Sequence, residues 1–118
     1  MHELSIIQNV ISAVCDIARD EELLSVERVV LLIGRLRQVV KDPMEFAYEI
    51  ATKDTIAEGS ELVMEFVPIR MRCNGCIKEF VVEDRTYICP ECESYDLKMI
   101  EGDELLIKSI VGEKEDGN

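Results

Sequence analysis

The sequence has few aromatic residues and few basic ones. Only 5% of its 118 residues are aromatic and none is tryptophan, so a hydrophobic core must be built mainly from aliphatic side chains. Lysine and arginine number 13 against 25 aspartate and glutamate residues, giving a formal net charge of −12. Because binding to nucleic-acid phosphates requires clustered basic side chains, we expect no nucleic-acid partner.

Long apolar runs are also missing. No stretch of about 18 apolar residues occurs, so the sequence predicts no membrane-spanning helix and no membrane partner. The N-terminus does not combine a basic segment with an apolar one, as a secretory signal peptide would. We therefore expect a cytoplasmic protein with reduced thiols. Hydrophobic residues make up 47% of the chain, which is sufficient for a folded core.

Four of the five cysteines form two Cys-x-x-Cys pairs, Cys73 with Cys76 and Cys89 with Cys92. Two such pairs can direct four thiolates at one ion, in the tetrahedral arrangement of a structural zinc site. We predict a zinc-binding four-cysteine module at residues 70–94. Two disulfides are an alternative that requires an oxidising compartment. A rubredoxin-like iron site and a plain zinc-ribbon interaction protein are further alternatives.

Two segments show helical periodicity. The first covers residues 4–18, and its apolar stripe consists of Leu4, Ile7, Val10, Ile11, Val14, Ile17 and Ala18. The second is expected to start with Asp42 as its N-cap and to run to about Lys53, because Asp42, Pro43 and Glu45 form a capping pattern. The inward side of this second helix is predicted to contain Phe46, Ala47, Ile50 and Ala51.

Segments rich in β-branched and aliphatic residues predict strands. Three longer strands are expected at 26–33, 61–67 and 104–111. Shorter strands are expected near the cysteines, at 80–82, 87–88 and 95–100. Cys15 lies beside the stripe of the first helix and is interpreted as a small core residue.

These elements together predict an α+β fold. It consists of a small three-stranded sheet with two helices on one face, plus an inserted zinc-ribbon module. The last long strand follows the second cysteine pair. The main domain is therefore expected to be discontinuous and to comprise residues 1–69 and 95–118.

The only histidine is the second residue. The α-amino nitrogen of Met1 and both the backbone and imidazole nitrogens of His2 can bind one ion, and the backbone nitrogen of Glu3 can complete a square plane. Such a set favours Ni(II) or Cu(II), and the affinity order favours copper. The residues alone therefore do not select the metal, and a solvated histidine before a helix is the simple alternative.

The N-terminal motif and the paired cysteines together resemble the HypA/HybF family, the nickel-incorporation proteins of [NiFe]-hydrogenase maturation. The shorter stretches that support the resemblance are Leu32-Ile33-Gly34, Thr55-Ile56-Ala57-Glu58-Gly59 and Gly102-Asp103-Glu104-Leu105. The resemblance implies a nickel metallochaperone and not an enzyme, with no catalytic residues. It implies Ni(II) as transferred cargo at Met1, His2 and Glu3, and structural Zn(II) at Cys73, Cys76, Cys89 and Cys92.

The same resemblance implies particular partners. Family members act with the GTPase HypB and deliver nickel to the hydrogenase large subunit, and in some organisms they also serve urease. A homodimer is a further possible assembly. The chain departs from many members at Val40 and Lys41, where an acidic residue is common, and it has no histidine in the zinc region.

Overall fold

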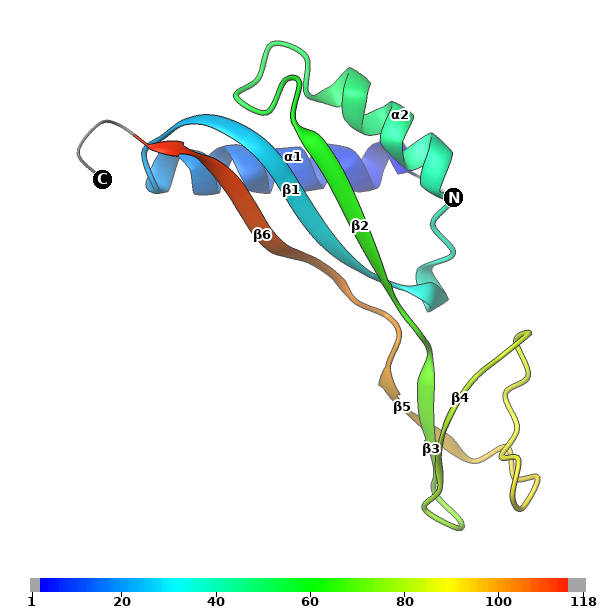
Figure 1. The fold of residues 1–118 in the computed structure, drawn as a ribbon. Helices are drawn as coiled ribbons and strands as arrows, with labels where there is room; N and C mark the ends of the chain where they lie inside the picture. The colour runs from blue at the N-terminus through cyan, green and yellow to red at the C-terminus, as the bar shows by residue number, and fades with distance from the viewer. Residues whose placement is uncertain (1–2, 115–118) are drawn as a thin grey trace. The chain divides into compact units, whose positions relative to one another are not determined.

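The computed structural model describes residues 3–114, so Met1, His2 and residues 115–118 lie outside the described residues. Its elements, shown in Figure 1, follow in the order α1 (Glu3–Asp20), β1 (Leu23–Gly34), the 3-10 helix η1 (Arg35–Arg37), α2 (Lys41–Ala51), β2 (Glu61–Val67), β3 (Arg70–Cys73), β4 (Glu79–Val81), β5 (Leu97–Glu101) and β6 (Leu105–Lys114). The predicted α+β fold is confirmed. Within the described part, no helix is both long and apolar enough to cross a membrane.

The chain divides into two compact units. The helical unit comprises Met1–Leu32, Val39–Glu65 and Leu106–Asn118, and the cysteine unit comprises Ile33–Gln38 and Phe66–Leu105. The functional division predicted from the sequence, with a nickel-binding domain at 1–69 and 95–118 and a zinc module at 70–94, stays a prediction.

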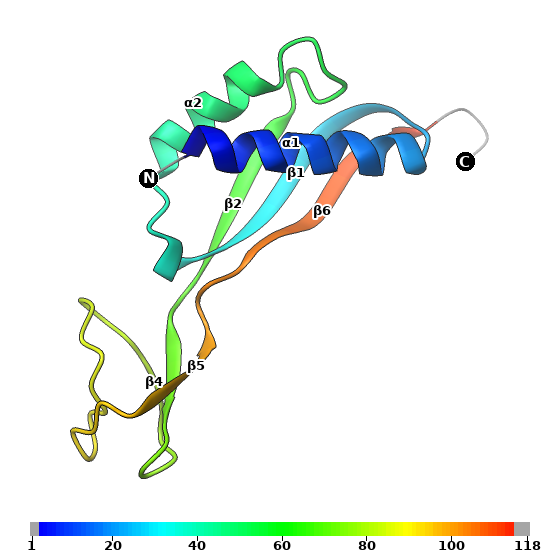
Figure 2. The same ribbon diagram turned by 180° about the vertical axis from the view of Figure 1, so that it is seen from behind.

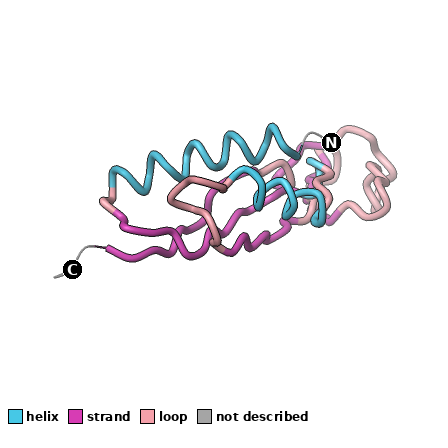
Figure 3. The backbone as a smooth tube through the Cα atoms, turned by 90° about the horizontal axis from the view of Figure 1, so that it is seen from above, coloured by secondary structure: helices cyan, strands magenta, loops and turns pink. Residues whose placement is uncertain are grey.

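The helical unit is built on the sheet β2-β1-β6, with β1 in the centre. Both helices lie on the same side of its strands (Figures 2 and 3). The sheet buries Val26, Val29 and Leu31 of β1 beneath them. The buried helical residues of this core are Ile7, Val10, Ile11, Val14, Ala18, Met44, Ala47 and Tyr48. The three long strands predicted from the sequence are therefore present, and they form one sheet.

Helix α1 agrees with its predicted stripe except at two positions. Leu4 and Ile17 are 51% and 38% exposed, whereas the other five stripe residues are buried. Both positions lie at the margin of the stripe, where side chains point partly away from the surface that the helix covers. Leu4 lies in the first turn of α1.

The sequence prediction for α2 was wrong in its start and in part of its inward side. The helix begins at Lys41, with Val40 in the N-cap position and no side-chain cap, so Asp42 lies within the first turn. Phe46 and Ile50 are 65% and 47% exposed, whereas Ala47, which was also predicted to face inward, is buried together with Met44 and Tyr48. Apolar residues occur on more than one side of this helix. The sequence pattern was therefore compatible with two different sides being buried.

The cysteine unit contains the sheet β4-β3-β5. Strand β3 pairs antiparallel with both neighbours, and Met71 lies opposite Phe80 on β4 and Met99 on β5. The strand predicted at 87–88 is absent. The backbone N–H of Thr86 instead donates to the carbonyl of Glu83 at 3.0 Å, which closes a turn. After this turn the chain enters the second cysteine loop without pairing with β4.

Segment η1 is fastened to the chain just before β6, inside the cysteine unit. The N–H of Gly34 donates to the carbonyl of Glu104 at 2.8 Å, and that of Leu36 donates to the carbonyl of Gly102 at 2.9 Å. A Cβ atom on Gly34 would lie 2.1 Å from the backbone of Gly102, so only glycine allows this approach. The side chain of Arg37 adds a hydrogen bond to the carbonyl of Asp103 at 2.7 Å.

Candidate metal centre

The four paired cysteines meet in one cluster. Their sulfur atoms all lie within 4.8 Å of one another. The Cys73 and Cys92 sulfurs are 3.5 Å apart, and so are those of Cys76 and Cys89. A tetrahedral ion with Zn–S bonds of about 2.3 Å separates its sulfur ligands by roughly 3.8 Å. The spacing therefore fits one ion bound by all four sulfurs.

Disulfide bonding does not describe this cluster. A disulfide bond is about 2.05 Å long, and the close pairs here join sulfurs of different loops at 3.5 Å. All four cysteines are free thiols. Cys73 and Cys89 are buried, whereas Cys76 and Cys92 are exposed. Each loop thus presents one inner and one outer sulfur to the common centre.

The two cysteine loops share one backbone pattern. In the first, the N–H of Cys73 donates to the carbonyl of Lys78, and the N–H of Ile77 donates to the carbonyl of Cys73, both at 2.9 Å. In the second, the N–H of Cys89 donates to the carbonyl of Ser94 at 3.0 Å, and the N–H of Glu93 donates to that of Cys89 at 2.8 Å. The loops are therefore structurally equivalent.

Each loop also has a non-glycine residue in the left-handed region, four positions after its first cysteine. These residues are Ile77, with φ of 70°, and Glu93, with φ of 62°. A β-branched residue such as isoleucine is strongly disfavoured there. Strain of this kind persists only where surrounding interactions hold it, and such residues cluster at functional sites.

Backbone donors acidify the inner thiol of the first loop. The N–H of Cys76 has the largest influence on Cys73. With the N–H of Gly75 and the thiol of Cys92, it outweighs burial and lowers the pKa of Cys73 to about 6. The pKa of Cys89 is likewise lowered, mainly by the N–H of Cys92.

The outer thiols shift in the other direction. The N–H of Ser94 is the largest single influence on Cys92 and lowers its pKa. The hydrogen bond to Cys73, burial and the other two thiols outweigh it and raise the pKa of Cys92 to about 12. The pKa of Cys76 is also raised, because Cys89, burial and Cys73 together outweigh the lowering effect of the Lys78 N–H. A divalent ion entering the cluster must therefore displace thiol protons.

Two of the three predicted N-terminal metal ligands, Met1 and His2, lie outside the residues that the structure describes. Their role as metal ligands therefore stays a prediction. Glu3 begins α1, and one of its carboxylate oxygens lies 3.4 Å from the backbone nitrogen of Val40, at the N-cap of α2. The first turn of α1 thus contacts the start of α2.

Sequence reasoning found the four cysteines but missed the residues that shape their loops. Neither Ile77 nor Glu93 is a residue type that favours the left-handed conformation, so nothing in the sequence marked these positions. The exposure of Phe46 and Ile50 was not predicted either, because the apolar residues of α2 are compatible with two different buried sides of the helix.

Comparisons with known proteins give a consistent result. The model of the family described as "Hydrogenase/urease nickel incorporation, metallochaperone, hypA" matches residues 1–112. The chain is 41% identical over 110 residues to the Hydrogenase maturation factor HypA of Geobacter metallireducens, covering 93% of this chain and 97% of that protein. It is 36% identical over 110 residues to the protein of the same name from Aquifex aeolicus, covering 93% and 96%.

A solved structure supports the fold. The chain is similar to the solution structure of the Ni metallochaperone HypA from Helicobacter pylori, with a TM-score of 0.69 and 24% identity. The match covers 98% of this chain and 100% of that one.

Proposed function

Because this chain belongs to the HypA family of hydrogenase and urease nickel-incorporation metallochaperones, we propose that it binds Ni(II) at its N-terminus and delivers it to the [NiFe]-hydrogenase large subunit. In this proposal Zn(II) at the four cysteines has a structural role, and the protein carries out no catalysis of its own. The observation that carries the proposal is the family match over residues 1–112, which includes both the N-terminal motif and all four cysteines.

The four-cysteine cluster suits a resident zinc ion. Its donors are four sulfurs, the ligand set typical of closed structural zinc sites. Cys73, Cys76, Cys89 and Cys92 would hold the ion and leave no ligand position open for a substrate. Zinc would supply folding free energy to the cysteine unit and no reactive group.

The N-terminal motif suits a removable ion. Nickel there would be bound by the α-amino group of Met1, the backbone and imidazole nitrogens of His2, and the backbone nitrogen of Glu3. Amine, imidazole and amide nitrogens favour the square-planar geometry of Ni(II). Ligands at a chain end can be displaced one at a time by a partner, as a delivery protein requires. The GTPase HypB and the hydrogenase large subunit are the partners in this proposal. The chain would act in the cytoplasm, and a homodimer is a possible state.

Native mass spectrometry of the untagged chain tests the separation of the two sites. We expect one zinc ion as purified and one additional nickel ion after Ni(II) is added. His2→Ala should abolish the specific nickel uptake and keep the zinc. A variant extended by one residue at the N-terminus is the matched control, because it keeps the imidazole but moves the amine out of register. Equal nickel uptake by the wild-type chain and His2→Ala would overturn the proposal.

A pH titration gives a second test. Nickel must displace protons from the amine, the imidazole and the amide, so its affinity should fall as the pH is lowered. Isothermal titration with Ni(II) at several pH values measures this dependence. Affinity that does not change with pH would exclude the proposed ligand set. Iron instead of zinc in the purified protein would favour a rubredoxin-like carrier.

A further inference from the structure

The first cysteine loop contains an asparagine that is directly followed by a glycine. Asn74 and Gly75 lie between Cys73 and Cys76, and both are exposed. Asparagine is a thermolabile residue. A following glycine increases its reactivity, because no Cβ atom hinders the glycine nitrogen when it approaches the asparagine side chain. The loop that carries two of the four sulfurs therefore contains a reactive pair.

Hydrogen bonds hold the two reactive groups apart in the folded loop. The N–H of Gly75 donates to the sulfur of Cys73 at 3.3 Å. The side-chain amide of Asn74 donates to the carboxylate of Asp96 at 3.1 Å, and its backbone N–H donates to the Asp96 carbonyl at 2.9 Å. Attack of the glycine nitrogen on the asparagine side chain breaks both side-chain contacts. The reaction therefore requires an opened loop.

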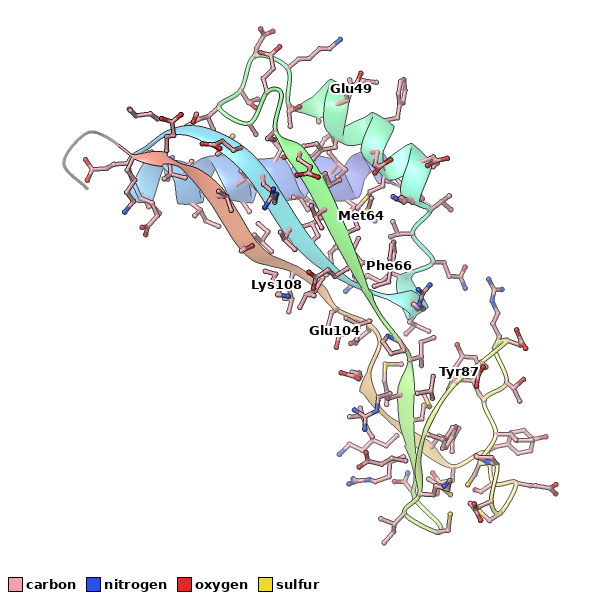
Figure 4. The ribbon with its side chains drawn as sticks, viewed as in Figure 1. Glu49, Met64, Phe66, Tyr87, Glu104 and Lys108 are labelled. Atoms are coloured by element: carbon pink, nitrogen blue, oxygen red, sulfur yellow. The ribbon has the colours of Figure 1, made fainter. Side chains whose placement is uncertain are left out.

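A zinc ion at the four cysteines would keep this loop closed. It would join two sulfurs of each loop, including the sulfur that accepts the glycine N–H. The ion pair between Lys78 and Glu91 also links the loops, but at 3.6 Å and with both side chains exposed it contributes little. Residues 82–88, which lead into the second loop, form no helix or strand, and Tyr87 among them is 36% exposed (Figure 4). Without the metal, the loops are therefore expected to open readily.

We propose that Asn74 is a site of spontaneous deamidation in the metal-free chain and that bound zinc suppresses this reaction. The nitrogen of Gly75 forms a bond to Cγ of Asn74, the bond from Cγ to Nδ2 breaks, and ammonia leaves with the Gly75 proton. Water then opens the resulting cyclic imide at either of its carbonyl groups, which gives aspartate or isoaspartate. The part played by zinc rests on the proposed function, whereas the reaction itself does not.

Both products would impair the metal site. A carboxylate only accepts hydrogen bonds, so the contact with Asp96 depends on the amide nitrogen of Asn74. Aspartate at this position would set two acceptors of like charge against each other. Isoaspartate would lengthen the backbone between Cys73 and Cys76 and so change the spacing that directs both sulfurs at one ion. A chain that stays without zinc for long would thus lose the ability to rebind it.

Peptide mass spectrometry of the full-length chain, incubated at neutral pH with bound Zn(II) or with a chelator, tests the proposal. Deamidation of Asn74 should be more than about tenfold faster in the chelated sample, because opening a zinc-bound loop costs more than a tenfold equilibrium step. Asn9 is the internal control, since it is exposed on α1 but precedes the β-branched Val10. It should stay unmodified in both samples.

Gly75→Ala is the matched variant. A Cβ atom at this position would lie 3.6 Å from the sulfur of Cys73, an ordinary contact, so the variant should bind zinc like the wild-type chain. Its methyl group hinders the attacking nitrogen, and the chelated variant should therefore deamidate several times more slowly. After long incubation with chelator, the wild-type chain should rebind less zinc, in proportion to its deamidated fraction, whereas Gly75→Ala should rebind its full amount.

Equal rates at Asn74 with and without zinc would overturn the proposal. So would an equal rate in chelated Gly75→Ala, or full zinc binding by the deamidated chain. An error in the zinc assignment of the proposed function has a different signature. In that case the chain binds no zinc under either condition, yet Asn74 is still modified faster in the wild-type chain than in Gly75→Ala.

Discussion

The helical unit and the cysteine unit are stabilised by different means. Of the 16 buried apolar residues in the described part of the chain, 12 belong to the helical unit. The cysteine unit contributes four, and two of these are the metal-ligand candidates Cys73 and Cys89. Its aliphatic core is therefore reduced to Ile33 and Ile69. A unit of this size with so few buried side chains cannot offset its loss of conformational entropy.

The difference shows where each unit obtains its folding free energy. The helical unit buries aliphatic surface between its sheet and two helices, which is sufficient for an independent core. In the cysteine unit, a bound ion must supply the missing stabilisation, as in small zinc modules that unfold without metal. It follows that metal removal and core substitution should act on different units.

Removing a metal ligand should have the largest effect. In Cys73→Ser we expect zinc loss and unfolding of the cysteine unit, because structural zinc contributes roughly 10–16 kcal/mol in small zinc modules. Amide hydrogen exchange should rise throughout β3, β4 and β5, while α1 keeps its protection. Cys15→Ser is the matched control, since Cys15 is a half-buried free thiol in the helical unit. Loss of protection in α1 after zinc removal would refute the independence of the units.

The converse substitution should affect only the helical unit. Leu31 is completely buried in the central strand β1. Leu31→Ala should lower the free energy of unfolding of this unit by about 2–5 kcal/mol, through lost burial and the cavity left behind. Urea unfolding followed by circular dichroism measures the change, and zinc content measured in parallel should stay at one ion per chain. Zinc loss in this variant would show that the cysteine unit depends on the helical core.

The same contrast explains how far the sequence alone could predict the molecule. Strand β2 was predicted with its observed bounds, Glu61–Val67, because a mainly apolar run ended at a proline. The cysteine cluster was predicted from spacing, since four thiols in two pairs allow few arrangements. Helix α2 was misjudged because Phe46 is apolar but exposed, and only the tertiary packing decides which side of that helix is buried. The left-handed Ile77 had no sequence signature, because the hydrogen bonds of the cysteine loop impose it.

Relieving the strain in the first cysteine loop should have a smaller, stabilising effect. Ile77 has φ of 70°, and its side chain is 70% exposed, so little packing is lost when it is replaced. Asparagine tolerates this conformation better than a β-branched residue. Ile77→Asn should therefore stabilise the zinc-bound cysteine unit by about 1 kcal/mol. Competition for zinc with a chromogenic chelator measures the gain, and Val81→Asn, at an exposed position on β4, is the control.

The smallest effect is expected at a polar contact within the helical unit. The hydroxyl of Tyr48 lies 2.6 Å from that of Ser60, which itself donates to the carbonyl of Ala57. Burial raises the pKa of Tyr48. Because Ser60 donates its single hydroxyl hydrogen to Ala57, the Tyr48 hydroxyl is the donor in this pair. Tyr48→Phe keeps the ring in the core and removes only the donor. We expect a loss of about 0.5 kcal/mol in the free energy of unfolding of the helical unit.

Urea unfolding measures this loss as a lower midpoint at an unchanged slope. Tyr48→Leu is the companion variant, because it removes the ring as well as the hydroxyl and should cost more. The zinc affinity of both variants should equal that of the wild-type chain, since Tyr48 and Ser60 belong to the helical unit. A Tyr48→Phe variant as stable as the wild-type chain would mean that apolar burial alone determines the stability of this unit. The contrast between a unit held by its core and a unit held by its metal would then be sharper still.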